Sequence, residues 1–107
     1  MILLVEDNED DATLMLRALG KQLPDSAIRV AHDGSEALDL LANWGDQELQ
    51  LVLLDVHLPR VSGLQVLEEL RKSPITRHVP VVMISGSLNK SDVIRSYDLG
   101  ANSFLNK

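Results

Sequence analysis

The feature that most constrains the fold of this chain is a regular alternation between two kinds of segment. Short runs rich in β-branched residues or leucine recur five times, at Ile2–Val5, Ile28–Ala31, Leu51–Leu54, Val81–Ile84 and Ser103–Asn106. The first, third and fourth runs are almost continuously hydrophobic, as is typical of parallel strands buried on both faces of a sheet. The pattern therefore predicts a five-stranded parallel sheet.

The segments between these runs have the spacing of amphipathic helices. Their apolar positions are Ala12, Met15, Leu16 and Leu19, then Ala37, Leu41 and Trp44, then Leu64, Leu67 and Leu70, then Val93, Ile94 and Tyr97. Asn89 and Asp92 predict the start of the fourth helix, because an Asn cap and an early acid favour a helix N-terminus. Gly20, Gly45 and Gly100 follow helical segments, where a left-handed glycine often ends a helix. This alternation predicts an α/β domain with helices on both faces of its sheet.

Length and composition narrow the class of protein further. With 107 residues, 45% hydrophobic and 24% charged, the chain is expected to form a single globular domain over residues 1–107. It contains no cysteine, which excludes a disulfide framework and a cysteine-ligated zinc site. The net charge of −6 argues against direct contact with nucleic acid. The apolar runs are too short to span a membrane and the N-terminus is a poor signal peptide, so we expect a cytoplasmic protein.

Five residues with charged or reactive side chains stand directly after predicted strands. Glu6 and Asp7 follow the first strand, and Asp55 follows the third. Ser85 follows the fourth strand and Lys107 the fifth. Ligands of open parallel sheets bind outside the carboxyl ends of the strands. We therefore expect three carboxylates, a hydroxyl and an ammonium group to converge on one edge of the sheet.

The chemistry of this set points to phosphoryl transfer assisted by a metal ion. Neighbouring carboxylates repel one another unless a cation offsets their charge. Because only oxygen ligands are on offer, a hard ion such as Mg²⁺, or alternatively Mn²⁺, is favoured over zinc. Asp55 is then the candidate nucleophile toward phosphorus. Lys107 and Ser85 are the candidates to stabilise the phosphoryl oxygens.

Each of these residues has an ordinary structural explanation when it is taken alone. Glu6 and Asp7 could simply be favourable charges at a helix N-terminus. Asp55 could be a turn or cap residue, and a serine before a glycine is common in loops. Their joint position at the same end of successive strands is what favours a functional site.

Four stretches of the sequence carry a resemblance to a known family. They are Leu3–Asn8, Leu53–Pro59 followed by Gly63, Val79–Gly86 and Gly100–Lys107. In this order they cover the whole chain, which resembles the receiver domain of two-component response regulators. The resemblance implies a flavodoxin-like, doubly wound fold with five parallel strands in the order 2-1-3-4-5.

A further resemblance narrows the subgroup. Leu4–Asn8, His32–Gly34 and Ser96–Gly100 are similar to the small regulators associated with bacterial phytochrome kinases. The family resemblance implies a phosphorylation switch in a phosphorelay, which catalyses only its own phosphorylation and dephosphorylation. The implied partners are a histidine kinase as phosphodonor and a downstream protein target, with a homodimer as a further candidate.

The resemblance also implies roles for the acids and for one histidine. Asp55 is similar to the phosphoacceptor of the family. Asp7 would ligate Mg²⁺ directly and Glu6 would assist, through water. His57 matches a position that ligates the metal through its backbone carbonyl, so its imidazole is not required at the metal.

Three more residues match positions that respond to phosphorylation in the family. Ser85 and Lys107 would hold the phosphoryl oxygens. Phe104 matches the aromatic switch position, which moves inward when the hydroxyl residue shifts. The resemblance thereby implies that phosphorylation changes the surface formed by the fourth helix and the fifth strand.

One departure from the family concerns the end of the sequence. The family normally continues past the lysine with a proline and a fifth helix, whereas this sequence stops at Lys107. We expect the natural chain to be longer, or else a second subunit to cover the face toward which Leu105 points. In either case apolar surface should be exposed there.

Three competing classes remain open at this point. An aspartyl-nucleophile phosphatase of the haloacid-dehalogenase type would need a second Asp two residues after Asp55, where this chain has His57. A nucleotide-binding domain would need a glycine-rich turn in place of Val5–Asn8. A degenerate receiver would act only as a protein-interaction module, although all five site residues are present.

The remaining basic side chains are not expected to form a site. We expect Arg60, Arg71 and Arg77 to be solvated. We expect His57 and His78 to lie in loops, and His32 to lie at the rim, just past the second strand. The sequence does not indicate the cognate kinase, the input signal or the output target.

Overall fold

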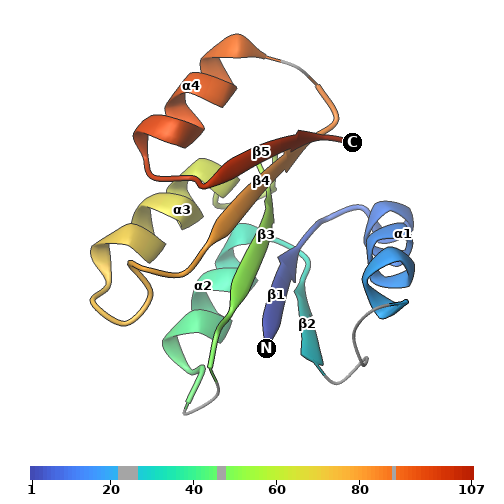
Figure 1. Ribbon diagram of the computed structural model, residues 1–107, viewed down its shortest axis with the longest axis horizontal. Coiled ribbons are helices and arrows are strands. Elements are labelled where there is room, and N and C mark those ends of the chain that lie inside the picture. The colour runs from blue at the N-terminus through green and yellow to red at the C-terminus, as the bar shows by residue number, and fades with distance from the viewer. Residues whose placement is uncertain (22–26, 46–47, 88) are drawn as a thin grey trace.

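Five strands and four helices alternate along the part of the chain that the computed structural model describes, residues 1–21, 27–45, 48–87 and 89–107. They are β1 (Ile2–Val5), α1 (Glu9–Gly20), β2 (Ile28–Ala31), α2 (Gly34–Ala42), β3 (Leu51–Asp55), α3 (Gly63–Lys72), β4 (Val81–Ser85), α4 (Lys90–Asp98) and β5 (Ser103–Asn106). All strands are parallel, and their order in the sheet is β2-β1-β3-β4-β5 (Figure 1). The predicted fold and strand order are confirmed.

Two strands extend one residue further than the sequence pattern suggested. β3 includes Asp55 and β4 includes Ser85. The parallel ladder continues to these positions, because Asp55 pairs with Ile84, and Ser85 pairs with Asn106. Both residues are therefore held by sheet hydrogen bonds rather than by a loop.

The central strands form the core of the domain. All four residues of β1 are buried, and Val52, Leu54, Val81 and Met83 of β3 and β4 are fully buried. Helix α3 packs the buried face of Leu64–Leu70 against them. Each fully buried Leu or Val stabilises the fold by about 1.5–3 kcal/mol, so the strands that carry the acids are the most firmly held part of the molecule.

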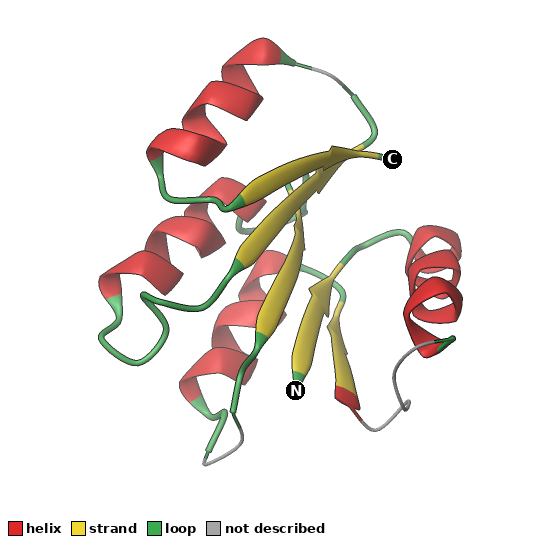
Figure 2. Cartoon of the chain, in the orientation of Figure 1, coloured by secondary structure: helices red, strands yellow, loops and turns green. Residues whose placement is uncertain are grey.

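The helices are distributed unevenly over the two faces of the sheet. Helices α2, α3 and α4 lie on one face and α1 lies alone on the other (Figures 1 and 2). The prediction that helices lie on both faces is therefore confirmed, although the two faces carry unequal numbers of them. None of the described helices is long and apolar enough to cross a membrane.

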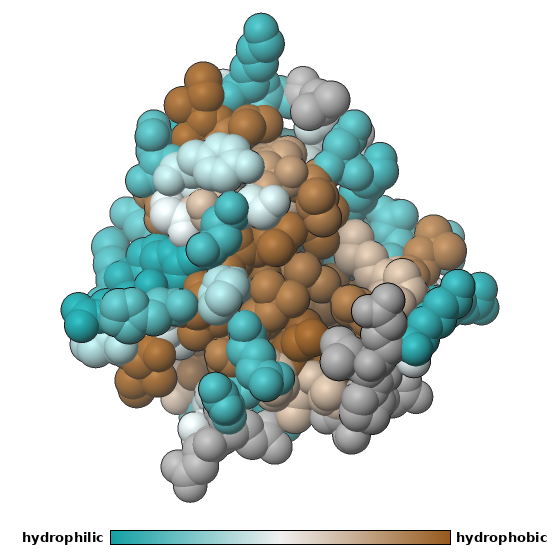
Figure 3. Space-filling model, viewed as in Figure 1, coloured by the Kyte–Doolittle hydropathy of each residue, from teal (hydrophilic) through white to brown (hydrophobic). Residues whose placement is uncertain are grey.

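Apolar surface is exposed where α1 leaves the sheet uncovered. A groove of about 390 Å³ is lined by residues of α1 and of the neighbouring strands, among them Leu14, Met15, Leu53, Ile84 and Leu105. Leu105 is 54% exposed, as the sequence predicted for this face. In the space-filling view, hydrophobic surface gathers in the middle of the side where the strands are not covered (Figure 3).

Polar side chains cap all four helices. Asn8, Asp33, Ser62 and Asn89 each accept a hydrogen bond from a backbone N–H in the first turn. Such a cap stabilises a helix by about 1 kcal/mol. The predicted cap at Asn89 is confirmed, and Asn8 starts α1 directly after the two acids that follow β1.

Two local predictions are wrong. Gly20 is the last residue of α1, and the helix ends in a right-handed Lys21, whereas Gly45 and Gly100 have the predicted positive φ of 79° and 104°. A glycine permits a left-handed end but does not require it. Trp44 does not lie on α2, because that helix ends at Ala42; it packs half-buried against the core from the loop.

Candidate functional site

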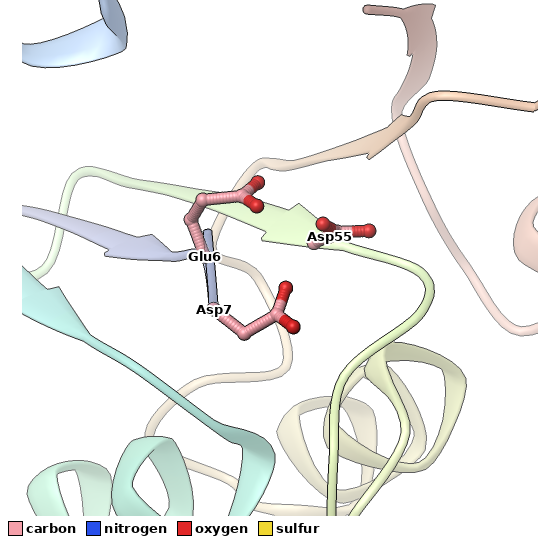
Figure 4. A group of neighbouring side chains, drawn as sticks. All are labelled: Glu6, Asp7 and Asp55. Carbon is pink, nitrogen blue, oxygen red and sulfur yellow. The ribbon is translucent and has the colours of Figure 1, made fainter. Parts of the chain in front are cut away.

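The predicted acids come together at the carboxyl edge of the sheet. Glu6 and Asp7 follow β1, and Asp55 is the last residue of β3. One carboxylate oxygen of each residue lies within 4.8 Å of one of each of the other two. Figure 4 shows the three side chains directed into the same space between the ends of the strands. The predicted convergence of these residues is confirmed.

The fifth predicted residue, Lys107, lies in the middle of this cluster. Its Nζ atom lies 2.7 Å from Oδ2 of Asp55, and 2.9 and 2.8 Å from the two carboxylate oxygens of Glu6. The side chains of Glu6 and Asp55 are almost completely buried, and that of Lys107 is only 19% exposed. Contacts between charges are strong away from water, so these ion pairs interact more strongly than exposed ones would.

The buried charges shift two pKa values. Burial raises the pKa of Glu6 above its ordinary value; the hydrogen bond from Lys107 opposes this effect and the charge of Asp55 adds to it. Burial alone would lower the pKa of Lys107, but its hydrogen bonds to Asp55 and Glu6 outweigh burial and keep the pKa above its ordinary value. Lys107 is therefore a permanent cation, while Glu6 ionises less readily than an exposed acid.

A hydrogen bond and close backbone packing hold the loop after β3 against Asp55. The backbone N–H of His57 donates to Oδ1 of Asp55 at 3.0 Å. Gly63, the first residue of α3, donates its N–H to Val56 and approaches the carbonyl of Asp55 so closely that a Cβ atom there would collide with it. Only glycine permits this approach. The close packing fixes the backbone at Asp55, and the hydrogen bond from His57 holds its carboxylate.

The arrangement fits a divalent metal ion. The oxygens of Glu6, Asp7 and Asp55 are the hard ligands that Mg²⁺ and Mn²⁺ prefer. Oδ2 of Asp11 also lies 3.2 Å from Nζ of Lys107, so three carboxylates share a single ammonium group. Oε2 of Glu6 is buried, and its one partner among the described residues is the ammonium of Lys107 at 2.8 Å. Asp7 is exposed, which leaves one side of the cluster open to an incoming ion.

Ser85 is next to the acids but not bonded to them. It is fully buried at the end of β4. Its hydroxyl donates to the carbonyl of Ser87 at 2.9 Å and accepts from the N–H of Ser87 at 3.2 Å. The hydroxyl is thus occupied by its own loop, and it would have to turn in order to reach a group on Asp55.

The remaining predicted residues lie around the cluster. Phe104 is half-buried on β5, pairs with Met83 of β4 and packs against the core. The imidazole of His57 is not among the clustered acids; its Nε2 lies 3.2 Å from Oδ2 of Asp92 on α4. The expectation that the ring of His57 is not needed at the metal agrees with this position.

Two acids at the site were not anticipated from the sequence. Asp11 reaches Lys107, and Asp92 reaches His57. Asp11 lies in the first turn of α1, where acids are common because they favour a helix N-terminus, so its contact with Lys107 had no specific signal in the sequence. The contact of Asp92 depends on where α4 packs, for which the sequence holds no local signal.

Comparisons with known proteins agree with the fold. Residues 2–107 match the family described as "Response regulator receiver domain". The chain is 37% identical over 111 residues to "Response regulator Rcp1" from Synechocystis sp., covering all of this chain and 76% of that protein. It spans only 23% of another relative, a "Probable cyclic di-GMP phosphodiesterase" from Vibrio cholerae, to which it is 33% identical over 106 residues, 99% of this chain.

Solved structures of response regulators also match this chain. The phosphorylated cyanobacterial phytochrome response regulator RcpA superposes with a TM-score of 0.92 at 35% identity, covering 99% of this chain and 79% of that one. The bacteriophytochrome response regulator AtBRR gives 0.85 at 47% identity, with coverage of 99% and 80%. The Mn²⁺-bound form of Rcp1 gives 0.87 at 34%, with coverage of 99% and 79%.

The chain therefore belongs to the receiver domain family of response regulators, within two-component signal transduction. Its relatives include the regulators that accompany phytochromes, as the sequence resemblance indicated. Receiver domains take phosphoryl groups from histidine kinases, bind divalent cations and act as switches.

Proposed function

We propose that Asp55 is the phosphoacceptor of this receiver domain and that Mg²⁺ assists its phosphorylation. The observation that carries the proposal is the position of Asp55: its carboxylate is buried beside the ammonium of Lys107 and within reach of two more acids. A buried carboxylate between a fixed cation and a metal-binding group has the surroundings that aspartyl phosphate chemistry requires.

The proposed metal ligands are the carboxylates of Asp7, Asp55 and Glu6, the last through water, and the backbone carbonyl of His57. A bound Mg²⁺ would supply positive charge to the phosphoryl oxygens as they approach; Mn²⁺ would fit the same oxygens. The three acids reach the site from two different strands, so the assembled fold is needed to bring them together.

The protein groups have separate tasks in the transfer step. An oxygen of Asp55 forms a bond to phosphorus while the bond from phosphorus to the donor histidine nitrogen breaks, and its electron pair returns to the donor imidazole. The N–H of His57 and the ammonium of Lys107, which lie 3.0 and 2.7 Å from the two oxygens of Asp55, hold the carboxylate in place. Lys107 then stabilises the added negative charge.

The response to phosphorylation would begin at Ser85. We infer that its hydroxyl leaves the loop contact with Ser87 and donates to the phosphoryl group. The loop after β4 would follow, and Phe104 would move into the space that is released. The surface of α4 and β5 changes as a result and is read by a downstream protein in the cytoplasm.

Partners follow from this scheme. The donor would be a histidine kinase, and the readout would be a contact with a protein rather than with nucleic acid. The exposed groove beside Leu105 is also available to a second copy of the chain, and light scattering with and without phosphorylation would test a homodimer.

A phosphorylation assay with acetyl phosphate and Mg²⁺ tests the assignment of Asp55. Intact-mass measurement should show one added phosphoryl group on the wild type and none on Asp55→Asn. Asp39→Asn is the matched control, because Asp39 is an exposed acid of α2; it should be modified like the wild type. Equal phosphorylation of Asp55→Asn would contradict the assignment of Asp55, and no phosphorylation of the wild type would favour a receiver that only binds partners.

A further inference from the structure

The inference concerns Asp11, an acid in the first turn of α1. Its Oδ2 atom accepts a hydrogen bond from Nζ of Lys107 at 3.2 Å. The residue is firmly placed, because its backbone N–H donates to the capping side chain of Asn8 at 2.9 Å. Its side chain is 37% exposed, whereas the other two partners of Lys107 are buried.

All three N–H donors of the Lys107 ammonium group are engaged in hydrogen bonds. An ammonium group has three N–H donors, and Nζ donates to three different carboxylates, those of Glu6, Asp11 and Asp55. Two of these partners, Glu6 and Asp55, also belong to the group of acids that can hold a metal ion, and Asp11 does not. The lysine and a divalent ion would therefore compete for the same two carboxylates.

Competition of this kind would displace the lysine. A divalent ion draws the oxygens of Glu6 and Asp55 toward itself and repels the neighbouring ammonium. The partner of Lys107 outside the metal group, Asp11, would keep its full attraction for the lysine. It approaches from α1, on the side of Lys107 that lines the groove beside Leu105.

We propose that Asp11 is a positioning residue that keeps Lys107 beside Asp55 when a divalent ion occupies the acidic cluster. Asp11 touches neither the metal nor the phosphoryl group; it acts through Lys107 alone. The proposal rests on the function proposed above for Asp55 and Lys107, and it adds a fourth acid to the site.

The direct test observes the ammonium of Lys107 by ¹⁵N–¹H NMR in the full chain at saturating Mg²⁺, without a phosphodonor. Lys107→Arg assigns the signal by removing it. The wild type should keep a protected Lys107 ammonium signal. Asp11→Asn should lose it, or exchange its protons with water about five-fold faster, the effect of losing one partly exposed ion pair. Asp11→Glu should restore the signal.

Asp10→Asn is the matched control. Asp10 is the neighbouring acid of the same helical turn, is exposed and makes no contact with Lys107 among the described residues. The Asp10→Asn variant removes the same charge from almost the same place, so its Lys107 ammonium signal should match that of the wild type. A general loss of negative potential would affect both variants equally, which would overturn the proposal; so would a wild type without the Lys107 signal in Mg²⁺.

A second readout separates lysine positioning from metal binding. With acetyl phosphate, Asp11→Asn should be phosphorylated about five-fold more slowly than Asp10→Asn at saturating Mg²⁺. The Mg²⁺ concentration for half-maximal rate should be the same in the two variants. Equal rates would count against Asp11. Because the NMR signal is recorded without a phosphodonor, it would still test Asp11 if the assignment of Asp55 failed.

Discussion

Two cationic side chains lie at opposite ends of the same sheet, and they have different kinds of partner. At the carboxyl edge, Lys107 donates to the charged oxygens of Glu6, Asp11 and Asp55. At the amino ends of β4 and β5, Arg71 of α3 donates only to neutral oxygens. These are the carbonyls of Thr76, Arg77, Val79 and Gly100 and the side-chain oxygen of Asn102.

The difference lies in the balance of charge. The planar guanidinium of Arg71 spreads its donors over two loops, and each acceptor is neutral, so the cluster has no excess negative charge to attract another ion. Burial lowers the pKa of Arg71, yet guanidinium groups stay protonated in proteins. Around Lys107, three carboxylates share a single ammonium group, and Asp7 lies beside two of them. A cluster with excess acid can accept a second cation and then a phosphoryl group, whereas a balanced cluster can only hold the chain together.

The largest expected effect comes from removing the ammonium group of Lys107 at the carboxyl edge. Lys107→Ala should lower the rate of phosphorylation by acetyl phosphate by about 10²–10³-fold, as expected when a group that stabilises the developing charge is removed. Arg71→Ala should leave the rate per folded molecule almost unchanged. Rates from a time course of intact mass would check both, and a normal rate for Lys107→Ala would mean that the lysine is only structural.

The second prediction concerns stability at the opposite end. Arg71→Ala should lower the free energy of unfolding by about 2 kcal/mol, because several carbonyls, two of them in part-buried hydrogen bonds, lose a charged donor. Urea denaturation would measure it. Arg77→Ala is a suitable control, because Arg77 is exposed. If both variants were equally stable, the loops at the amino ends would not depend on Arg71.

A third effect should distinguish the two ends by their response to metal. Mg²⁺ at about 100 times its dissociation constant should raise the free energy of unfolding of the wild type by about 2.7 kcal/mol. Arg71→Ala should show the same increase from a lower starting value, and Asp7→Asn should show much less at equal Mg²⁺. Urea titrations with Mg²⁺ and with a chelator would measure this, and an equal response of Asp7→Asn would argue against the acids as the metal ligands.

The smallest effect is a pH dependence that belongs to the acidic cluster alone. The pKa of Glu6 is raised above its ordinary value of 4.5, so just above pH 4.5 the folded protein binds more protons than the unfolded chain. The contribution of Glu6 to stability is therefore present below this pH and is lost as the pH rises through the folded pKa. Without metal, the stability of Glu6→Gln relative to the wild type should increase with pH in this window.

Thermal unfolding in a chelator between pH 4 and pH 7 would measure this trend, with pH steps of about half a unit. Glu69→Gln, at an exposed acid of α3, provides the control and should follow the wild type. A parallel course of all three proteins would show that Glu6 titrates normally.

Much of the fold and of the acidic site could be predicted because the information is local. Hydrophobic runs mark the strands, and in a parallel sheet the residue after each run must lie at the same edge. Glu6, Asp7, Asp55 and Lys107 were found for this reason. Ser85 was placed correctly as well, but its bond to Ser87 was not visible, since rotation of a hydroxyl leaves no trace in the sequence.

The features that were missed depend on contacts between distant segments. Arg71 was expected to be solvated, yet two of its nitrogens donate to Gly100, 29 positions away. The register of α3 against the loop before β5 decides this contact, and no local pattern reports it. Trp44 was misplaced because α2 ends early, where Asn43 bonds back to three carbonyls of its last turn.

The contact between Gly63 and the carbonyl of Asp55 has a consequence for protein engineering. The acceptor strand and the first turn of α3 are fitted to each other at the level of the backbone. A graft that moved only the acceptor strand into another scaffold would leave the backbone of Asp55 without the helix that packs against it. The smallest transplantable unit is therefore the strand together with the returning helix, with a residue that lacks a side chain at their junction.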